Sequence, residues 1–275
     1  MTVEELIVLG KKYTSSTHAK MLLANFLEVN PLELLTILDK VVEEDKINLY
    51  KKSLEALKEN RPIQYVIGHV NFYGLQFKVN ENVLIPRFET EELVENIKNY
   101  LKKKNLTNPK ILDLGCGSGV IGLTLKHFFP DSDVTLVDIS EEALEVTRDN
   151  AKSLGLDVNF IKSDWFSNVP VDKYDVIVSN PPYIRTDEEI EEIVKNNEPH
   201  LALYGGIDGL DCYRSILKDI NNYLKDDYLI AFEIGYLEGS ALKELVKDTI
   251  LNSKVTIKKD LSNKDRMFFV EKNID

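Results

Sequence analysis

The chain has 275 residues, of which 43% are hydrophobic and 29% are charged, with 13 glycines and 9 prolines. This composition is typical of a globular protein, and it excludes a collagen-like or disordered chain. The length fits one large α/β domain or a main domain with a smaller companion. Because 34 Lys and Arg stand against 46 Asp and Glu, the net charge is −12, which disfavours a nucleic acid as the main ligand.

The sequence also bears on location and on metal binding. No segment approaches the roughly 20 apolar residues of a membrane span, and Glu4 and Glu5 stand where a secretion signal would carry positive charge. We therefore expect a cytoplasmic protein that has no membrane partner. The two cysteines, Cys116 and Cys212, lie far apart, and the four histidines form no cluster with metal-ligand spacing. We expect neither a disulfide framework nor a metal site.

The first sixty residues predict a small bundle of helices, because apolar residues recur at three-and-four spacing and no strand pattern interrupts them. Asn30 precedes Pro31 as a natural N-cap, and Glu33 follows as in a capping box. The predicted helices cover residues 3–12, 19–27, 31–39 and 45–60.

A different pattern follows the bundle. Tyr65, Val66 and Ile67, and then the apolar positions from Phe72 to Val79, are broken by glycines, which predicts a short β-hairpin. We interpret this hairpin as a connector. The predicted domains are therefore a helical domain at residues 1–62, the connector at 63–85 and a main domain at 86–275.

The main domain alternates strand-like and helix-like segments, which indicates parallel strands joined by helical crossovers. The last two strands are joined by a short polar turn and should pair antiparallel at the edge of the sheet. The predicted fold is thus an α/β domain with a mostly parallel seven-stranded sheet that ends in an antiparallel hairpin. The predicted strands are residues 110–114, 134–138, 158–163, 175–179, 228–234, 254–259 and 267–271.

A glycine-rich loop follows the first strand of this sheet, and a helix pattern begins at Val120. The turn after the first strand of an open α/β sheet lies where ligands bind, and glycines let the backbone approach a ligand closely. Asp138 ends the second strand, 19 residues after Gly119. At this spacing along the sequence an acidic side chain can accept hydrogen bonds from a ribose diol. A cofactor that contains a nucleoside is implied. Its predicted contacts are Gly115, Cys116, Gly117, Ser118, Gly119 and Asp138, with no chemistry assigned to the Cys116 thiol.

Two cofactor classes fit this loop. Gly117, Gly119 and Gly122 satisfy the dinucleotide fingerprint, which is a weak signal on its own, and an ordinary glycine turn is a further alternative. Asp113 and Gly115 complete the pattern Asp-x-Gly-x-Gly-x-Gly, which resembles the loop of S-adenosylmethionine-dependent methyltransferases. The fold of those enzymes also ends in an antiparallel hairpin.

The fourth strand ends in Asn180, Pro181, Pro182 and Tyr183. Two consecutive prolines fix the backbone and donate no N–H, so nearby carbonyl groups are left to accept. The Asn180 side-chain oxygen and the Pro181 carbonyl can each take one hydrogen of a planar NH₂ group, while Tyr183 lies against its flat face. The prediction is a conjugated amino or amide nitrogen as the acceptor; the alternative is a plain Pro-Pro turn.

These motifs together resemble the HemK/PrmC family, the glutamine methyltransferases of peptide chain release factors. The resemblance covers nearly the whole chain and also includes residues 85–87, 89–91 and 205–210. It implies a class I, Rossmann-like methyltransferase domain at 86–275 and a substrate-recognition role for residues 1–62. It further implies S-adenosyl-L-methionine as the cofactor and the glutamine of the release-factor Gly-Gly-Gln motif as the methyl acceptor.

The resemblance also assigns individual positions. It places Asn180, Pro181, Pro182 and Tyr183 on the glutamine amide, with Asn180 also counted among the cofactor-binding residues. Trp165 corresponds to a position beside the adenine. One departure is Phe88, which stands where the family usually has proline; we expect it to line the methionine side of the cofactor pocket.

Several other functions remain open at this point. A ribosomal-protein glutamine would fit the same turn, and so would the exocyclic amine of adenine or guanine, although the charge of −12 disfavours a nucleic acid. A nucleotide-binding protein without catalysis and a dinucleotide enzyme are the remaining alternatives. For Glu233 two roles stay open, orienting a ligand or only capping its strand.

Overall fold

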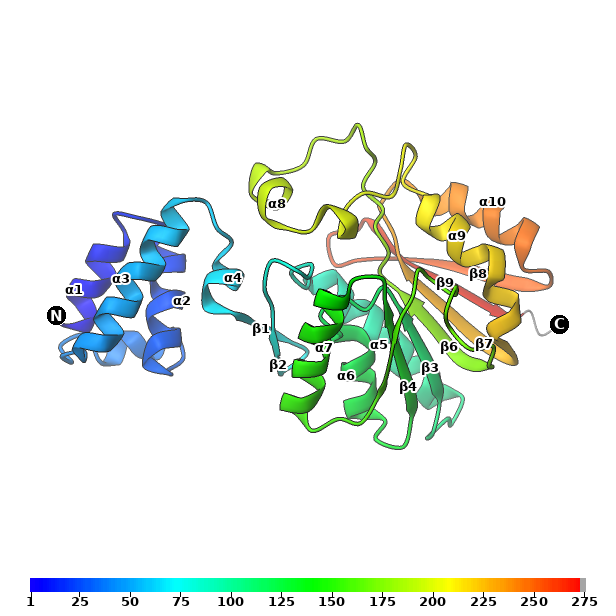
Figure 1. Ribbon diagram of the computed structural model, residues 1–275, viewed down its shortest axis with the longest axis horizontal. Coiled ribbons are helices and arrows are strands. Elements are labelled where there is room, and N and C mark those ends of the chain that lie inside the picture. Colours follow the sequence, from blue (N-terminus) through cyan, green and yellow to red (C-terminus); the bar gives the residue numbers. More distant parts are fainter. Residues whose placement is uncertain (273–275) are drawn as a thin grey trace. The chain divides into compact units, whose positions relative to one another are not determined.

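The computed structural model describes residues 1–272, and the chain divides into two compact units (Figure 1). The N-terminal unit comprises residues 1–69 together with 190–197. The sheet unit comprises residues 70–189 and the chain from residue 198 onward. None of the helices described for residues 1–272 is long and apolar enough to cross a membrane.

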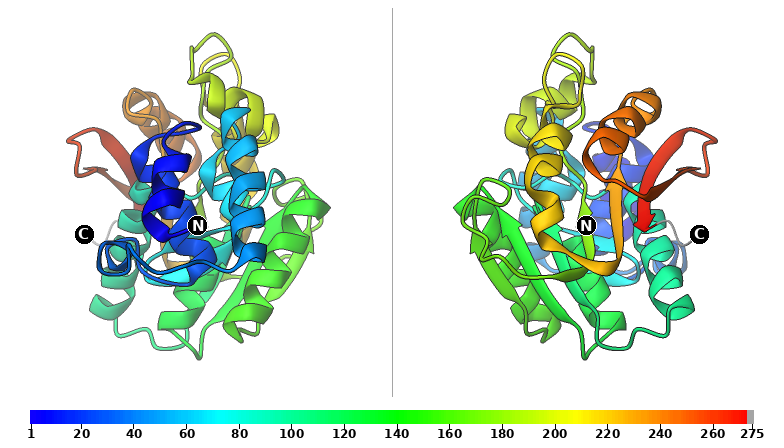
Figure 2. Two further views of the ribbon diagram at one scale, coloured as in Figure 1. Left: turned by 90° about the vertical axis from the view of Figure 1, so that its left-hand side faces the viewer. Right: turned by 90° about the vertical axis from the view of Figure 1, so that its right-hand side faces the viewer.

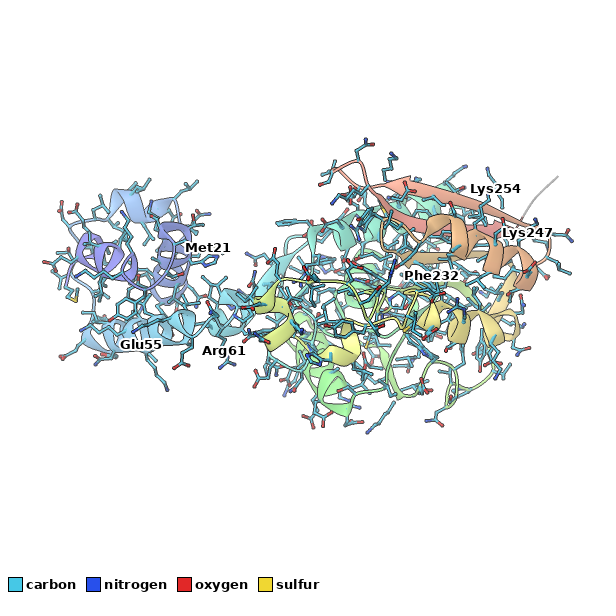
Figure 3. The ribbon with its side chains drawn as sticks, turned by 90° about the horizontal axis from the view of Figure 1, so that it is seen from above. Met21, Glu55, Arg61, Phe232, Lys247 and Lys254 are labelled. Carbon is cyan, nitrogen blue, oxygen red and sulfur yellow. The ribbon has the colours of Figure 1, made fainter. Side chains whose placement is uncertain are left out.

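The N-terminal unit is a bundle of short helices with its own apolar core. The first helix begins with a complete capping box, in which the Glu5 N–H donates to Thr2 Oγ1 (3.2 Å) and the Thr2 N–H donates to Glu5 Oε2 (2.9 Å). In Figure 3 the labelled Met21 and Glu55 lie on helices of this unit. Its elements are α1 (Val3–Gly10), α2 (Ser16–Leu27), a 3₁₀ turn (Glu33–Thr36), α3 (Glu44–Lys58), α4 (Ile63–Ile67) and α8 (Glu192–Asn197).

Two predictions for this region were wrong. Residues 31–39 form only the 3₁₀ turn, since the chain after it pairs with the start of α1: the Leu38 carbonyl accepts from the Glu4 N–H (3.0 Å) and the Lys40 carbonyl from the Val3 N–H (3.0 Å). Residues 65–67, expected to be part of a strand, lie in α4. That helix starts after Pro62 and ends at Gly68, whose φ of +87° is the left-handed conformation typical of a helix C-terminus.

The hairpin starts later than predicted and consists of β1 (His69–Phe72) and β2 (Leu75–Lys78). Tyr73 and Gly74 both have positive φ, as two-residue hairpin turns require. The Asn150 side chain fixes β2, because it accepts from the Lys78 N–H (2.7 Å) and donates to the Lys78 carbonyl (3.0 Å). The hairpin strand β2 is thus tied to a helix of the sheet unit.

The seven-stranded sheet has the predicted architecture. Its order is β5-β4-β3-β6-β7-β9-β8, where neighbours from β5 to β7 are parallel and β9 is antiparallel to both β7 and β8. This confirms the α/β fold with a terminal antiparallel hairpin. The strands are β3 (Lys110–Leu114), β4 (Asp133–Asp138), β5 (Asn159–Lys162), β6 (Tyr174–Ser179), β7 (Leu224–Glu233), β8 (Ser253–Lys259) and β9 (Asp265–Lys272).

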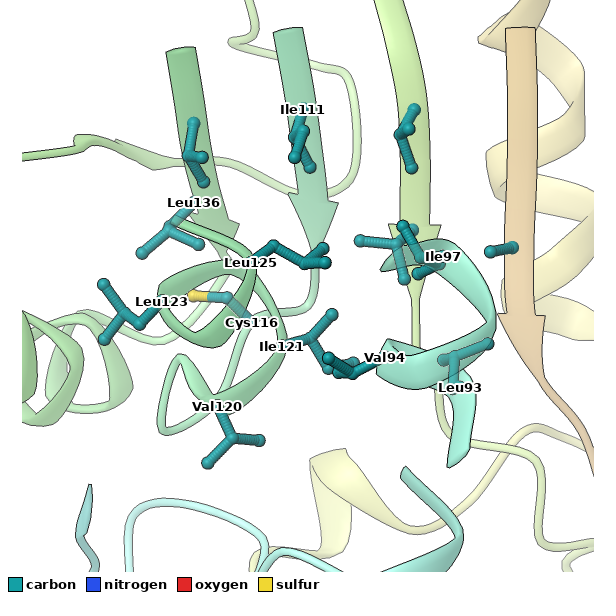
Figure 4. Close-up of a cluster of buried hydrophobic side chains, with 14 of the residues drawn as sticks. Leu93, Val94, Ile97, Ile111, Cys116, Val120, Ile121, Leu123, Leu125 and Leu136 are labelled. Atoms are coloured by element: carbon teal, nitrogen blue, oxygen red, sulfur yellow. The ribbon is translucent and has the colours of Figure 1, made fainter. Parts of the chain in front are cut away.

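Helices cover both faces of the sheet, as Figures 1 and 2 show. One face packs against α5 (Phe88–Lys103), α6 (Val120–Phe128) and α7 (Glu141–Leu154), and the other against α9 (Asp211–Asp219) and α10 (Gly239–Thr249). Alternate strand residues face the two layers, since Ile111 belongs to the first core and Leu112 to the second. Figure 4 shows Ile97 of α5, Leu125 of α6 and Ile111 of β3 in the first core.

We expect Gly10→Ala to destabilise the N-terminal unit by about 1–3 kcal/mol, the usual cost of overpacking. A Cβ atom there would lie 2.1 Å from the Tyr50 hydroxyl oxygen and 2.7 Å from the Ala19 Cβ. Tyr50 is fully buried, and its hydroxyl lies 3.2 Å from the carbonyl oxygens of Leu6 and Ala19, so it cannot move without losing them. Hydrogen exchange measures the effect: amides of α1 to α3 should exchange faster. The exposed Val8→Ala in the same helix is the control, and equal exchange in both variants would contradict the prediction.

Candidate functional site

A pocket with a volume of about 350 Å³ lies at the carboxyl ends of the parallel strands, where open α/β sheets bind ligands. All of its lining residues belong to the sheet unit. Within residues 1–272, no group of His, Cys, Asp and Glu side chains could hold a metal ion. The predicted site residues that line the pocket are Gly115, Cys116, Gly117, Ser118, Asp138, Trp165, Asn180 and Pro182.

The glycine loop is held from behind by α7. Gly115, Gly117 and Gly119 have φ values of +70°, +55° and +81°, which side chains rarely tolerate. The Thr147 hydroxyl donates to the Gly117 carbonyl (2.6 Å), and the Asn150 amide donates to the Ser118 carbonyl (2.9 Å). These bonds turn the loop's carbonyls toward α7 and fix the loop shape at the pocket.

Gly119 supports the loop without lining the pocket. A Cβ atom on it would lie 2.5 Å from Thr147 Cγ2 and 2.9 Å from Leu123 Cδ1. Its role in this structure is therefore the close approach of the loop to α7 and α6. At Gly117, by contrast, a Cβ atom would meet nothing within 4 Å, so the backbone there faces open space.

Asp138 closes the adjacent wall at the end of β4. Its Oδ2 accepts from the Gly117 N–H (2.8 Å) and its Oδ1 from the Ser140 N–H (2.9 Å). Burial raises the pKa of this carboxyl group, although the backbone N–H donors oppose that shift. Because a carboxylate offers about four lone-pair sites, Asp138 keeps capacity for a further donor from the pocket.

Asp113 has a structural position that the sequence did not reveal. It is fully buried under the loop, where its Oδ2 accepts from the Gly122 N–H (2.9 Å) in the first turn of α6. Its Oδ1 has no hydrogen-bond partner among the described residues. Burial raises the pKa of Asp113 to about 7, with the Asp138 charge adding to the shift. The group is therefore substantially protonated near neutral pH.

We expect this carboxyl group to make stability fall as the pH rises. A carboxyl whose folded-state pKa is about 7, against 3.8 ordinarily, binds its proton more tightly in the folded state. Its contribution to the free energy of unfolding is complete below about pH 4 and is lost as the pH rises to about 7. For one group the slope of this loss cannot exceed about 1.4 kcal/mol per pH unit. Asp113→Asn stays neutral and should flatten the dependence.

Urea unfolding at pH 5, 6 and 7 tests this expectation. The matched control is Asp133→Asn, because Asp133 is exposed at the start of β4 and should leave the wild-type slope unchanged. If Asp113→Asn unfolds with the wild-type slope, Asp113 is not the group responsible.

The other predicted cofactor-binding residues are Trp165, Cys116 and Phe88, and they differ in how far each is buried. Trp165 is half-buried with a φ of +46°, and its ring would lie 3.6 Å from a Cβ atom on Gly115, so it packs across the loop. The Cys116 thiol is buried, which raises its pKa well above the ordinary value and keeps it from acting as a thiolate. Phe88 is not where we expected it: it is the first residue of α5, its side chain is 82% exposed and it does not line the pocket.

The Asn-Pro-Pro-Tyr turn leaves the end of β6 beside the pocket. Ser179 Oγ donates to the Leu114 carbonyl (2.6 Å), which ties the end of β6 to the end of β3. Asn180 and Pro182 line the pocket, whereas Pro181 is buried and Tyr183 lies outside the lining. Burial raises the pKa of Tyr183, so its hydroxyl stays protonated.

The glycine-rich segment 205–210 supports this turn from outside. The Gly205 N–H donates to the Ile184 carbonyl (2.8 Å), and a Cβ atom on Gly205 would lie 2.5 Å from the Pro182 carbonyl oxygen. Likewise, a Cβ atom on Gly209 would lie 2.5 Å from the Tyr183 carbonyl oxygen. The segment 205–210 and the Asn-Pro-Pro-Tyr turn, which the sequence analysis treated as separate motifs, therefore pack directly against each other.

Sequence reasoning missed two polar residues behind the turn and left a third open. The Asn180 amide contacts Thr90, whose hydroxyl donates to the buried Glu233 carboxylate (2.6 Å). The Tyr183 hydroxyl also contacts Glu233 (3.4 Å) and accepts from Arg266 (3.3 Å). Thr90 lies in the segment 89–91 that the resemblance included without giving the residue a role, and Glu233 lies at a strand end. Arg266 had no such signal in the sequence.

A second buried carboxylate fixes the segment that leads into α5. Glu198 accepts from the Ile85 N–H (3.1 Å) and from Arg87 Nη2 (2.6 Å), and Arg87 Nη1 donates to the Ile85 carbonyl (2.8 Å). The Glu198 side chain is only 2% exposed, whereas the Arg87 side chain is 35% exposed, so the carboxylate is shielded from water and its cation only in part. It places Pro86, which lies between the two, in the pocket wall.

Comparison with known proteins adds to this geometry. Residues 89–207 match the methyltransferase small domain, and residues 9–68 match the PrmC N-terminal domain. Among solved structures, a methyltransferase from Pyrococcus furiosus is similar with a TM-score of 0.54 at 20% identity, over 74% of this chain and 91% of that one. The hMettl16 catalytic domain has a TM-score of 0.55 at 12% identity, over 85% and 83% of the two chains. At these identities the structures support the fold alone.

Closer relatives are found by sequence. The release factor glutamine methyltransferase of Streptococcus pneumoniae is 44% identical over 86% of this chain and 84% of its own length. Those of Bacillus cereus and Bacillus subtilis are 38% and 40% identical, over 92% and 85% of this chain and 91% and 83% of their own lengths. With this similarity along nearly the full length, and with a helical N-terminal unit and a methyltransferase sheet in one chain, the protein belongs to the release factor glutamine methyltransferase family.

Proposed function

We propose that this protein transfers a methyl group from S-adenosyl-L-methionine to the side-chain amide nitrogen of the Gly-Gly-Gln glutamine of peptide chain release factors. The observation that carries the proposal is a single pocket that brings the glycine loop and Asp138 together with Asn180 of the Asn-Pro-Pro-Tyr turn. The family membership selects the protein substrate among the acceptors that such a turn could hold.

The residues of the pocket fit this cofactor. A volume of about 350 Å³ is within the range of pockets that enclose small ligands. The backbone at Gly117 faces open space, and Asp138 keeps acceptor capacity for a ribose hydroxyl. Trp165, packed across Gly115, offers a flat apolar surface for a base. When bound, S-adenosyl-L-methionine supplies an electrophilic methyl group on a sulfonium, which is a good leaving group.

The Asn-Pro-Pro-Tyr turn would then hold the acceptor. The Asn180 side-chain oxygen and the Pro181 carbonyl accept one hydrogen each from the glutamine amide, and Tyr183 supports the turn. An amide nitrogen is weakly nucleophilic because its lone pair is delocalised. Holding both hydrogens orients the lone pair toward the methyl group and stabilises the positive charge that develops on nitrogen. The nitrogen then loses one of its two hydrogens as a proton to solvent, which leaves a neutral N-methyl amide.

We assign the remaining roles by domain. The helical part predicted as residues 1–62 recognises the protein substrate, and the domain predicted as residues 86–275 carries out the transfer. The connector predicted at residues 63–85 starts later, because residues 63–67 form α4 and belong, with residues 190–197, to the N-terminal unit. The helical part supports this division, because it has its own buried core, which includes Leu6, Leu22 and Tyr50, and matches the PrmC N-terminal domain. The net charge of −12 favours a protein over a nucleic acid as the acceptor. Release factors work on cytoplasmic ribosomes, so the proposed activity belongs in the cytoplasm.

Mass spectrometry of a release factor incubated with this protein and S-adenosyl-L-methionine tests the proposal. One methyl group should appear on the Gly-Gly-Gln glutamine, and none on a release factor in which that glutamine is alanine. An unmodified glutamine with consumed cofactor would instead point to a ribosomal protein or a nucleic acid as the acceptor.

A further inference from the structure

We propose that Glu233 and Thr90 are positioning residues, which form a hydrogen-bond relay that holds the Asn180 side-chain amide with its oxygen directed away from Thr90 and available to the substrate. This inference rests on the proposed function, in which that oxygen accepts a hydrogen from the glutamine amide. Nothing in the Asn-Pro-Pro-Tyr turn itself determines which way the Asn180 amide faces.

The first link of the relay is the buried pair of Thr90 and Glu233. Thr90 lies in the first turn of α5 and is 2% exposed, and Glu233 ends β7 and is 1% exposed. Thr90 Oγ1 lies 2.6 Å from Glu233 Oε2. An ionised carboxylate can only accept hydrogen bonds, so the single hydroxyl hydrogen of Thr90 must point at Glu233.

The second link follows from the first. Since Thr90 has donated its only hydrogen, its oxygen can only accept from its other neighbour, the Asn180 side chain at 3.5 Å. The group that faces Thr90 must therefore be the Asn180 NH₂, and Oδ1 is directed away from it. In the opposite orientation, two acceptors would face each other at Thr90, and the substrate NH₂ would meet another NH₂.

Glu233 also fixes the far end of the turn. The Tyr183 hydroxyl donates to Glu233 Oε1 (3.4 Å) and accepts from Arg266 Nη1 (3.3 Å), which donates in addition to the Ile234 carbonyl (3.0 Å). One buried carboxylate thus accepts from Tyr183 at the end of the turn and from Thr90, which in turn contacts Asn180 at its start. Both arms depend on its negative charge.

The groups around Glu233 determine the pH range in which its carboxyl group is ionised. Burial raises the pKa of Glu233, and Glu89 adds to the increase, whereas Arg266 and the hydrogen bonds from Thr90 and Tyr183 lower it. Protonation would place a hydrogen between the carboxyl group and one of its two donors and so disturb that arm. The relay therefore predicts that kcat falls on the acid side, at a higher pH than an ordinary glutamate would give.

The first arm of the test uses Thr90 variants in the full-length protein with a release factor as substrate. Thr90→Val keeps the shape but removes the hydroxyl, and should lower kcat about tenfold, while KM changes by less than about twofold. Because Thr90 also lines the pocket, the cofactor Kd is measured for each variant, and it should change less than kcat does. Thr90→Ser keeps the hydroxyl and should restore kcat. The matched control is Thr124→Val, because Thr124 is buried on α6 and its hydroxyl has no hydrogen-bond partner among the described residues. Glu233→Gln should remove the acid limb of the kcat profile.

The second arm does not depend on activity. With ¹⁵N-labelled asparagine, the Asn180 side-chain NH₂ signal is identified by its loss in Asn180→Ala, and its exchange with water is measured. It should exchange about tenfold faster in Thr90→Val than in wild type or Thr90→Ser. If the wild-type protein does not methylate release factors, the proposed function fails, and this exchange comparison alone decides the relay.

Two results would overturn the relay. One is an unchanged exchange rate of the Asn180 NH₂ in Thr90→Val, with kcat within about twofold of wild type where there is activity. The other is a Thr90→Ser variant as impaired as Thr90→Val, because that outcome would assign Thr90 a packing role.

Discussion

Asn180→Ala is expected to lower kcat by about 10²–10³, the effect of removing one hydrogen-bonding group that acts on the transition state. The reason is positional: without the Asn180 oxygen, one hydrogen of the substrate amide has no acceptor and the nitrogen lone pair is free to turn away from the methyl group. Asn180 also contacts Thr90 at 3.5 Å, so its loss leaves the relay without its last member. Cofactor binding should weaken less, because Asn180 is only one of the residues that line the pocket.

The measurement combines turnover with calorimetric binding of S-adenosyl-L-methionine. Asn168→Ala is the matched control, since Asn168 donates to the Lys162 carbonyl (3.1 Å) at the end of β5 and does not line the pocket. A variant at position 180 with near wild-type kcat would show that the turn does not hold the acceptor. Equal losses of kcat and of cofactor affinity would instead assign Asn180 to cofactor binding.

Asp138→Ala is expected to raise the Kd for S-adenosyl-L-methionine about 100-fold, with little change in the affinity for the release factor. The carboxylate accepts from the Gly117 and Ser140 N–H groups, so the variant loses both a ligand partner and a support of the glycine loop. Hydrogen bonds to a charged group contribute about 1.5–3 kcal/mol each. The loss of the bond to the ligand, together with the loss of the support of the loop, therefore accounts for a rise in Kd of about 100-fold.

The pH dependence supplies a second readout for Asp138. A ribose diol donates to the ionised carboxylate, so binding should weaken as the pH falls through the pKa of Asp138, which burial raises above its ordinary value. In Asp138→Ala this acid-side weakening should disappear. The control is Asp133→Ala at the opposite end of β4, where the side chain is exposed and far from the strand end that faces the pocket. Unchanged cofactor affinity in Asp138→Ala, or binding of a nicotinamide cofactor, would contradict the assignment.

Local patterns in the sequence were enough for most of the fold. The alternation of buried strands and amphipathic helices predicted the seven strands, because the periodicity of apolar residues in a strand or a helix depends only on residues that are close in sequence. The two errors occurred where short apolar runs are ambiguous. Residues 65–67 fit a strand by composition but form α4. Residues 31–39 form only a 3₁₀ turn, because the carbonyls of Leu38 and Lys40 accept from the start of α1.

The motifs of the site were also readable, because their residue types and their positions at strand ends follow from chemistry and topology. The glycine loop and Asp138 lie side by side since β3 and β4 are neighbouring parallel strands. Phe88 shows the limit of such reasoning. Its place in a motif suggested the pocket, but the direction of its side chain depends on where α5 begins, and it is exposed.

By itself, then, the sequence predicted the fold class and marked the glycine-rich loop and the Asn-Pro-Pro-Tyr turn as candidates for the site, because each is a local pattern of nearby residues. Only the tertiary structure decided what lies behind them. Thr90 and Glu233 are 143 residues apart in sequence yet 2.6 Å apart in space, and Asp113 has a buried oxygen with no hydrogen-bond partner among the described residues. Such contacts depend on how helices pack on the sheet, and no spacing along the chain encodes the distance between two side chains from different layers.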